Sequence, residues 1–208
     1  MHLFVQINQH LNNIIKQTGI TNKKKAELLR NMCRILPKPV LEHSQRVSRG
    51  CIRIAKVHQP NMCQEELDLL QSAAYFHDIG KLFINDTILK KPGRLSPSEY
   101  AIVKNHTYIG HAMLLKMGAR KDVAEALLFH HENSNGSGYP TGISGSQIPM
   151  PARLIHVMDV YDALTSDRPY RSAYTPSVAV EILRNEHTNY DTDVLNVLVN
   201  LSKEGMLG

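Results

Sequence analysis

Histidine and carboxylate side chains stand at five places along the chain where they could bind metal ions. They comprise five imidazoles and two carboxylates: His43, His77, Asp78, His106, His130, His131 and Asp159. Nitrogen and oxygen ligands of this kind suit iron, manganese or zinc rather than magnesium or copper(I). Seven ligands are too many for one catalytic ion, which must keep positions open for water and substrate. The set therefore predicts two ions sharing a carboxylate, an arrangement suited to phosphoryl chemistry.

Each of these residues also has an ordinary structural explanation. A lone histidine on an apolar helix face, such as His43 or His106, is a metal ligand in only about one case in five. Adjacent pairs such as His77-Asp78 and His130-His131 are scarcer but ambiguous in isolation. The joint occurrence of all five segments, with a glycine-rich loop after His131, favours the metal site.

Two further charged residues lie close to the candidate ligands in the sequence. Lys81 follows His77 by four residues and could reach a phosphate held by metal ions, or it could be an exposed lysine at a helix end. Asp162 follows Asp159 by three residues, on the same face of a helix. It could orient a ligand, take part in proton transfer, or form an ion pair with Arg168 or Arg171.

The spacing of apolar residues predicts that helices position these side chains. From residue 40 onward we expect helices at 40–58, 64–79, 97–116, 120–131, 151–164, 176–187 and 191–203. The segment 132–150 contains four glycines and two prolines and is the longest irregular stretch. A loop of that length inside a compact domain is usually functional or disordered. The predicted fold class is an all-α bundle with one long functional loop.

The first 37 residues are expected to form a separate helical extension. Apolar residues three and four apart predict one helix over 3–16 and another running to Leu36, before Pro37 and Pro39 stop the chain. This pair of helices is too small to act as a sensor domain. We expect it to serve in docking or homodimer formation, with the catalytic domain at 38–208.

Composition limits the class of protein and its compartment. The chain has 208 residues, 42% of them hydrophobic, which is enough for one globular domain. It lacks a secretory signal and an apolar run of the ~20 residues that a membrane span requires, so a cytoplasmic protein without membrane insertion is expected. Three cysteines without CxxC spacing argue against disulfides and thiolate metal sites. The formal charge of +5 suits a phosphate-bearing ligand but is too small to predict nucleic-acid binding.

Four longer motifs resemble those of the bacterial HD-GYP domain family. Residues 77–81, HDIGK, look like its HDxGK motif, and residues 130–140, HHENSNGSGYP, resemble HHE…DGxGYP. Residues 159–171, DVYDALTSDRPYR, are similar to the family's DxxDALTSxRPYR segment, and residues 42–47, EHSQRV, fit its opening motif. The resemblance covers residues 38–205 in the family's order, and the combination of motifs is highly specific.

The resemblance implies an HD-superfamily helical bundle that holds two, sometimes three, iron or manganese ions. It implies hydrolysis of the second messenger cyclic di-GMP to linear pGpG, in some members onward to GMP. The seven residues above would be the metal ligands, with Asp78 bridging two divalent ions. Catalysis would fall to Lys81, at the scissile phosphate, with Asp78 and Asp162. The nucleotide would be held by Gly138, Tyr139, Arg168 and Arg171.

The chain departs from the family pattern at several positions. Pro39 stands where three-metal members carry a glutamate, which argues for two ions rather than three. Asn133 and Asn135 replace the usual arginine and aspartate of the loop. His111 and His156 stand where the family has small or apolar residues, and both are expected to be incidental. The alternative is that His156, three residues before Asp159, lies near the metals.

The mechanism implied by the resemblance is in-line attack by a metal-bridging hydroxide on one phosphodiester bond. One alternative is a cyclic GMP-AMP hydrolase, because the sequence does not show how the base is recognised. Another is a catalytically weak module that senses the dinucleotide or docks on a partner. A nucleotidase of the wider HD superfamily is disfavoured by the GYP loop.

Overall fold

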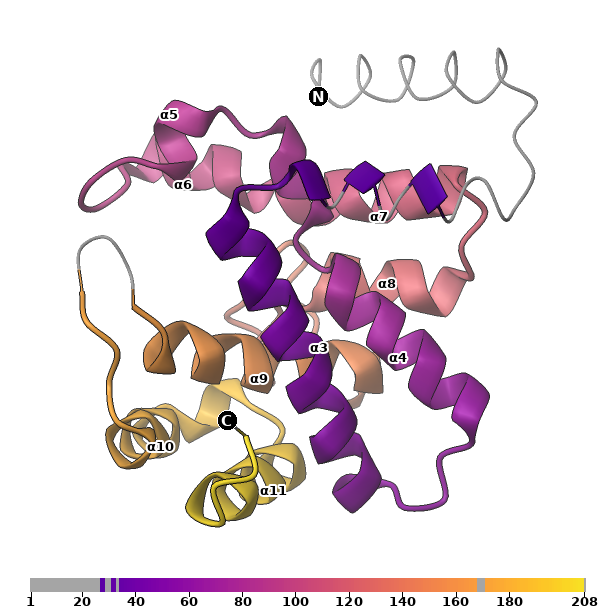
Figure 1. The fold of residues 1–208 in the computed structure, drawn as a ribbon, viewed down its shortest axis with the longest axis vertical. Helices are drawn as coiled ribbons and strands as arrows, with labels where there is room; N and C mark the ends of the chain where they lie inside the picture. The colour runs from indigo at the N-terminus through magenta and orange to yellow at the C-terminus, as the bar shows by residue number, and fades with distance from the viewer. Residues whose placement is uncertain (1–26, 29–30, 33, 168–170, 208) are drawn as a thin grey trace.

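The computed structural model describes residues 27–28, 31–32, 34–167 and 171–207. The fold is built from α-helices, as predicted (Figure 1). They are α3 (Lys38–His58), α4 (Gln64–Phe76), α5 (Asp86–Leu89), α6 (Pro97–Lys104), α7 (His106–Lys116), α8 (Lys121–Phe129), α9 (Met150–Thr165), α10 (Pro176–Asn185) and α11 (Thr192–Lys203). Short 3-10 helices occur at Ile79–Phe83, Gly145–Gln147 and His187–Asn189.

Helix α3 runs through the middle of the bundle and packs against α4, α9 and α11 (Figure 1). Val47, Cys51 and Ile54 recur on its buried face at the spacing of an amphipathic helix. Gly50 lies on the same helix, and a side chain there would collide with Met158 of α9. This close approach of α3 and α9 brings their functional side chains, 116 or more residues apart in the sequence, into contact.

Three predicted helices extend too far or should be divided, and each difference falls at a candidate ligand. The helix expected at 64–79 ends at Phe76, before His77 and Asp78. The helix expected at 97–116 is two helices, α6 and α7, which meet at Asn105 just before His106. The helix expected at 120–131 ends at Phe129, just before His130. These ligands therefore stand at helix boundaries, where the side chains of several helices can converge on one point.

The backbone is closely packed at the break before His106. Gly80, in the 3-10 turn after Asp78, lies so near α7 that a side chain would collide with the carbonyl of His106. Apolar periodicity carries no information on such a contact. The short helix α5 was missed for a similar reason, since its four residues are too few to show a period.

The predicted N-terminal helices lie largely outside the described residues. The described residues of the second one, 27–28, 31–32 and 34–35, are helical, and Leu28 and Met32 pack against the core. The division at residue 37 stays a prediction. Among the described helices, none combines the length and the apolar character that crossing a membrane requires.

Candidate metal centre

The structure brings all seven predicted ligands together. Their ligand atoms form overlapping groups within 4.8 Å of one another. One group, called here the carboxylate half, comes from α3, the end of α4 and α9; the other, the imidazole half, comes from the start of α7 and the end of α8. The carboxylate half is His43, His77 and Asp159, and the imidazole half is His106, His130 and His131. Asp78 stands between the two.

The carboxylate half is built around Asp159. Its Oδ1 atom lies 2.8 Å from Nε2 of His43 and 3.9 Å from Nε2 of His77. Its Oδ2 atom lies 4.0 Å from Nδ1 of His131, so this carboxylate also faces the imidazole half.

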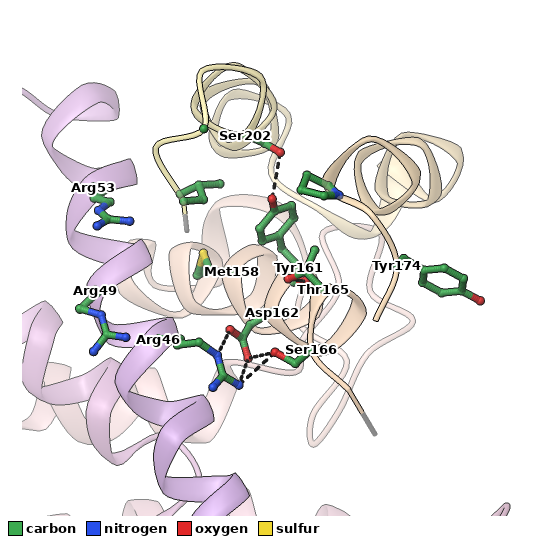
Figure 2. Close-up of a pocket in the computed structure, with 13 residues that line it drawn as sticks. Arg46, Arg49, Arg53, Met158, Tyr161, Asp162, Thr165, Ser166, Tyr174 and Ser202 are labelled. Carbon is green, nitrogen blue, oxygen red and sulfur yellow. Dashed lines mark hydrogen bonds and ion pairs between the residues drawn. The ribbon is translucent and has the colours of Figure 1, made fainter. Parts of the chain in front are cut away.

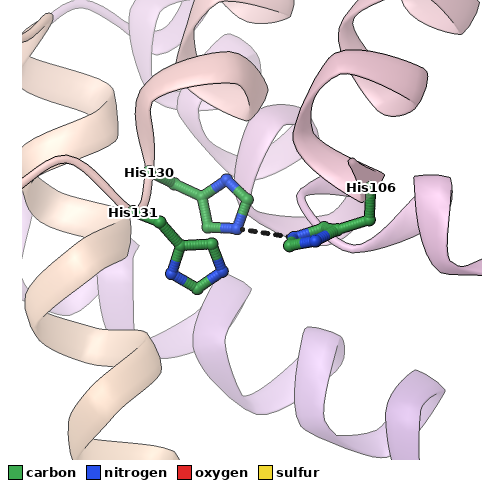
Figure 3. Close-up of side chains that lie close together, drawn as sticks. All are labelled: His106, His130 and His131. Atoms are coloured by element: carbon green, nitrogen blue, oxygen red, sulfur yellow. Dashed lines mark hydrogen bonds between the residues drawn. The ribbon is translucent and has the colours of Figure 1, made fainter. Parts of the chain in front are cut away.

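The imidazole half has three rings and no carboxylate of its own (Figure 3). Nε2 of His106 lies 3.4 Å from Nε2 of His130, and the ring centroids of His130 and His131 are 4.0 Å apart. Two imidazole nitrogens that face each other at this distance suit a shared metal ion, because each can offer it a lone pair.

Asp78 faces both halves with different oxygens. Its Oδ2 atom lies 3.4 Å from Nε2 of His77, and its Oδ1 atom lies 3.4 Å from Nε2 of His106. Oδ2 also accepts a hydrogen bond from Nζ of Lys81 at 2.6 Å. This position is the one that a bridging carboxylate requires, and it places Lys81 at the edge of the centre.

Backbone carbonyls set the orientation of three of the rings. Nδ1 of His77 lies 2.7 Å from the carbonyl of Ala74, and His106 and His130 make the same contact with residues three positions earlier. These carbonyls are available because the helices end there. With Nδ1 donating to the carbonyl, Nε2 keeps its lone pair and points into the centre, as in protein metal sites.

Two buried polar atoms of the centre are left without partners. Nε2 of His77 and Oδ1 of Asp78 have no hydrogen bond among the described residues, although both side chains are at most 2% exposed. Burying a polar atom without a partner costs free energy, so such atoms are rare in native proteins. Both are ordinary metal-ligand atoms. The residues present therefore fit a pair of cations.

The ionisation of the centre also suits cations. Burial opposes charge on Asp78 and Asp159, but Lys81 and His77 hold the pKa of Asp78 well below the usual range, and His43 and His77 do the same for Asp159. Burial lowers the pKa of His106 to about 4 and that of His130 and His131 well below the ordinary value. Burial also acts to lower the pKa of His43, but hydrogen bonds to Asp159 and Asp162 outweigh it and raise it to about 9.

Asp162 supports a ligand and is held in place by an arginine that the sequence analysis missed. Its Oδ2 atom lies 2.7 Å from Nδ1 of His43, and its Oδ1 atom accepts a 2.7 Å hydrogen bond from Nε of Arg46. The alternative of an ion pair with Arg171 is not what the structure shows, because the Arg171 guanidinium donates to the carbonyls of Ala163 and Leu164. Arg168 lies outside the described residues. Asp162 thus orients His43, while Arg171 closes the end of α9.

The glycine-rich loop is fixed to the centre by Glu132. Its buried carboxylate accepts hydrogen bonds from the backbone amides of Thr141 and Gly142, at 2.6 Å and 3.0 Å. Gly138 packs directly on the backbone of residues 131–133, which leaves no room for a side chain. The glycine is therefore needed within the loop itself, and a nucleotide contact of Gly138 stays a prediction. Asn135 bonds to Asn189, away from the ligands.

Tyr139 forms one wall of the centre together with two residues of α6. Its ring stacks on His131 with centroids 4.8 Å apart and meets the ring of Tyr100 edge-on. Nζ of Lys104 lies 4.7 Å from the Tyr100 ring centroid and 4.9 Å from that of Tyr139. Tyr100 and Lys104 were not predicted, since their i,i+4 spacing is equally typical of a solvated helix face.

The two additional histidines differ from each other. His111 is half-buried on α7, and its charged neighbours are Glu125 and Lys121 of α8. His156 is buried and packs on the ring of Tyr190, and neither of its ring nitrogens has a hydrogen-bond partner in the described part of the chain. Neither residue belongs to the groups of potential ligands formed by the described residues.

The chain is similar to known proteins over most of its length. A family model described as "HD domain" matches residues 27–194. The 3'3'-cGAMP-specific phosphodiesterase 1 of Vibrio cholerae is 35% identical over 181 residues, which are 86% of this chain and 42% of that protein. The cyclic di-GMP phosphodiesterase of Thermotoga maritima is 38% identical over 170 residues, 78% of this chain and 44% of that protein. The chain thus spans less than half the length of these relatives.

Solved structures share the fold. A Bdellovibrio bacteriovorus HDG"Y"P protein aligns with a TM-score of 0.69 and 16% identity, over 97% of this chain and 70% of that chain. The HD domain of the L. monocytogenes phosphodiesterase PgpH, in complex with cyclic-di-AMP, aligns with a TM-score of 0.62 and 13% identity, over 86% of this chain and 95% of that chain. At these identities the likeness concerns the fold alone.

Proposed function

Since this chain belongs to the HD-domain family, in its HD-GYP group, we propose that it is a metal-dependent phosphodiesterase that hydrolyses a bacterial cyclic dinucleotide. The observation that carries the proposal is the convergence of seven nitrogen and oxygen ligands in two halves that share Asp78. A pair of cations on one carboxylate suits displacement at a phosphodiester. We further propose iron or manganese as the ions, because imidazole and carboxylate ligands without thiolate suit them.

Bound metal ions would supply a water that is ionised near neutral pH and positive charge next to the phosphoryl oxygens. The chain's own residues would do the rest. Lys81, at the edge of the centre beside Asp78, would offset the negative charge that builds on the phosphoryl group. Asp162 would hold His43 in the orientation that presents Nε2 to the centre.

Substrate binding would use the wall beside His131. Tyr139 and Tyr100 offer aromatic faces, and Lys104 lies within 5 Å of both ring centroids, so the wall combines a surface for a base with a cation for a phosphate. Arg168 and Arg171 remain proposed nucleotide contacts. The Arg171 guanidinium would have to leave the carbonyls at the end of α9 to make one.

Cyclic di-GMP is the substrate that we favour, with linear pGpG as the product. The relatives from Thermotoga maritima and Vibrio cholerae, named for cyclic di-GMP and for 3'3'-cGAMP respectively, support both dinucleotides as candidates. A module that binds the dinucleotide without turning it over is a weaker alternative, because every proposed ligand and Lys81 are in place. We also propose a cytoplasmic location and a docking or dimerising role for residues 1–37.

Product analysis tests the proposal. Purified chain loaded with manganese or ferrous iron under reducing conditions is incubated with cyclic di-GMP, and separately with cyclic GMP-AMP. We expect chromatography to show a linear dinucleotide from cyclic di-GMP, and no product after chelation. Binding of cyclic di-GMP without any product from either substrate would replace the enzyme by a sensor.

A further inference from the structure

Asp162, which contacts the ligand His43, also lines a second pocket (Figure 2). It has a volume of about 410 Å³ and lies between α3, α9 and the residues after α11. That volume is within the range of small-molecule sites in proteins. Among the candidate ligands, none lines the pocket; its link to the centre is Asp162, which holds His43.

Three arginines of α3 form one wall of the pocket. Arg46, Arg49 and Arg53 are three and four residues apart, so they share one face of the helix. Like charges at this spacing repel each other and destabilise a helix. Asp162 is the single carboxylate among the lining residues, so the pocket is strongly positive.

The three arginines differ in the partners that their guanidinium groups have. Arg46 is bound to Asp162 through Nε and Nη2 and to Ser166 through Nη2. Arg53 donates to the carbonyl of Met206. Arg49 has no hydrogen bond or ion pair with any described residue, although its side chain lines the pocket. A guanidinium is a fixed fork of donors that matches a phosphate, so Arg49 lacks the anion for which such a group is suited.

The remaining lining gives the pocket an apolar part. Met158 and Tyr161 of α9 and Leu207, which follows α11, also line the pocket. The Tyr161 hydroxyl is 2.9 Å from Oγ of Ser202, so its polar end is satisfied and its ring is left as an apolar surface. Apolar walls with a few convergent polar groups are typical of sites for organic molecules rather than bare ions.

We propose that this pocket is a second ligand site, separate from the metal centre, which binds a small organic phosphate monoester through Arg49 with Arg53 beside it. The phosphate supplies the anion that Arg49 lacks, and the organic part covers Met158 and Tyr161. A ligand in this position also faces Arg46, which holds Asp162 on His43. The site therefore lies next to Asp162 and Arg46, which position the proposed metal ligand His43, but none of the proposed metal ligands belongs to it.

Calorimetric titration with phenyl phosphate tests the proposal on the full chain loaded with manganese and again after chelation. Arg49→Gln removes the guanidinium that has no anionic partner. Lys56→Gln removes one charge from an exposed position of the same helix, α3, outside the pocket. We expect Arg49→Gln to weaken the binding that survives chelation about tenfold, the effect of losing one charge-assisted hydrogen bond. We expect Lys56→Gln to change it less than about twofold, since it loses only general electrostatic attraction.

The outcome separates this site from the metal centre. Phenyl phosphate held by metal ions is lost on chelation, whereas binding at Arg49 persists, so the pocket can exist even if the proposed phosphodiesterase activity does not. An unaltered dissociation constant in Arg49→Gln, equal losses in the two variants, or no binding after chelation would each overturn the proposal. Arg49 is exposed, so a fold comparable to the unaltered chain, checked by thermal unfolding, is expected for both variants.

Discussion

The carboxylate half and the imidazole half of the candidate metal centre hold their side chains by different means. In the carboxylate half, His43 lies between Asp159 and Asp162, and Arg46 fixes Asp162 in turn. In the imidazole half, His106 and His130 donate to backbone carbonyls, and His131 stacks on Tyr139 of the loop. In the first half, charges across two helices hold His43 and a helix-end carbonyl holds His77, whereas the second half is held by helix ends and ring packing alone.

This difference predicts a division of labour. An ion in the carboxylate half meets Asp159 and Asp78, and an anionic ligand set attracts a cation strongly in a buried site. An ion in the imidazole half would share Asp78 and face only the more distant Oδ2 atom of Asp159. It would lie beside the wall of Tyr139, Tyr100 and Lys104. We therefore expect the carboxylate half to bind its ion more tightly and the imidazole half to lie nearer to the substrate.

The largest expected effect comes from the residue that the halves share. Asp78→Ala removes an oxygen ligand from each half and the partner of Lys81, so we expect loss of both ions and of all measurable activity. Elemental analysis and product chromatography measure the two losses. His111→Ala, on α7 but outside the ligand groups, is the control and should keep both. If Asp78→Ala still bound both metal ions, the two halves could not be treated as one centre joined by Asp78.

Lys81 should affect catalysis without emptying either half. Its charge matters most while negative charge develops on the phosphoryl oxygens, so Lys81→Ala should lower kcat about 100-fold, as for other single donors to such a transition state. Steady-state kinetics, with metal content measured on the same sample, checks this. A raised KM at unchanged kcat would contradict this, because it would mean that Lys81 binds the substrate equally in the ground state and the transition state. Loss of metal would mean that Lys81 acts by holding Asp78 in place.

Asp162 should affect the carboxylate half alone. Asp162→Asn removes the charge that supports His43, and loss of such an outer partner typically lowers metal affinity about 10- to 100-fold. Manganese titration should show one weakened site and one unchanged site. Asp191→Asn removes a partly buried, arginine-paired carboxylate at the start of α11 and serves as the matched control. Equal weakening of both sites by Asp162→Asn would contradict the division between the halves.

Proton competition should distinguish the halves with a smaller effect. The pKa of His43 is raised to about 9, so below that pH a metal ion must displace its proton. The apparent manganese affinity of the carboxylate half should therefore fall about tenfold for each unit by which the pH is lowered. The pKa of His106 is lowered to about 4, so this ring is already deprotonated at neutral pH. The manganese affinity of the imidazole half should therefore not change with pH in this range. Manganese titrations at pH 6, 7 and 8 check this. Parallel slopes for the two sites would show that His43 is not the competing group.

The sequence predicted the ligands better than the contacts that support them. Six of the seven candidate ligands belong to short local motifs, whereas His106 stands outside the four motifs and was named from its residue type and the family resemblance. The structure brings all seven together. Arg46 stood within the EHSQRV motif, but its partner Asp162 is 116 residues away and no local spacing connects them. Glu132 belonged to the HHE motif, yet its contacts with Thr141 and Gly142 depend on how the loop folds back.

The fold shows the same limit. The all-α class followed from apolar periodicity, which records the buried face of each helix. The end of α4 at Phe76 and the break at Asn105 do not follow from it, because apolar periodicity carries no information on backbone contacts such as that of Gly80 with α7. Arg171 was considered as an ion-pair partner of Asp162, but it donates to carbonyls left free at the end of α9, and its contact with the nucleotide stays a prediction.

Anomalous diffraction from crystals of the manganese-loaded chain is the most direct test of the proposed two-metal centre. The arrangement predicts two peaks near Asp78, one within contact distance of His43, His77 and Asp159 and the other within contact distance of His106, His130 and His131. A single peak at saturating manganese, or a second peak away from Asp78, would contradict it.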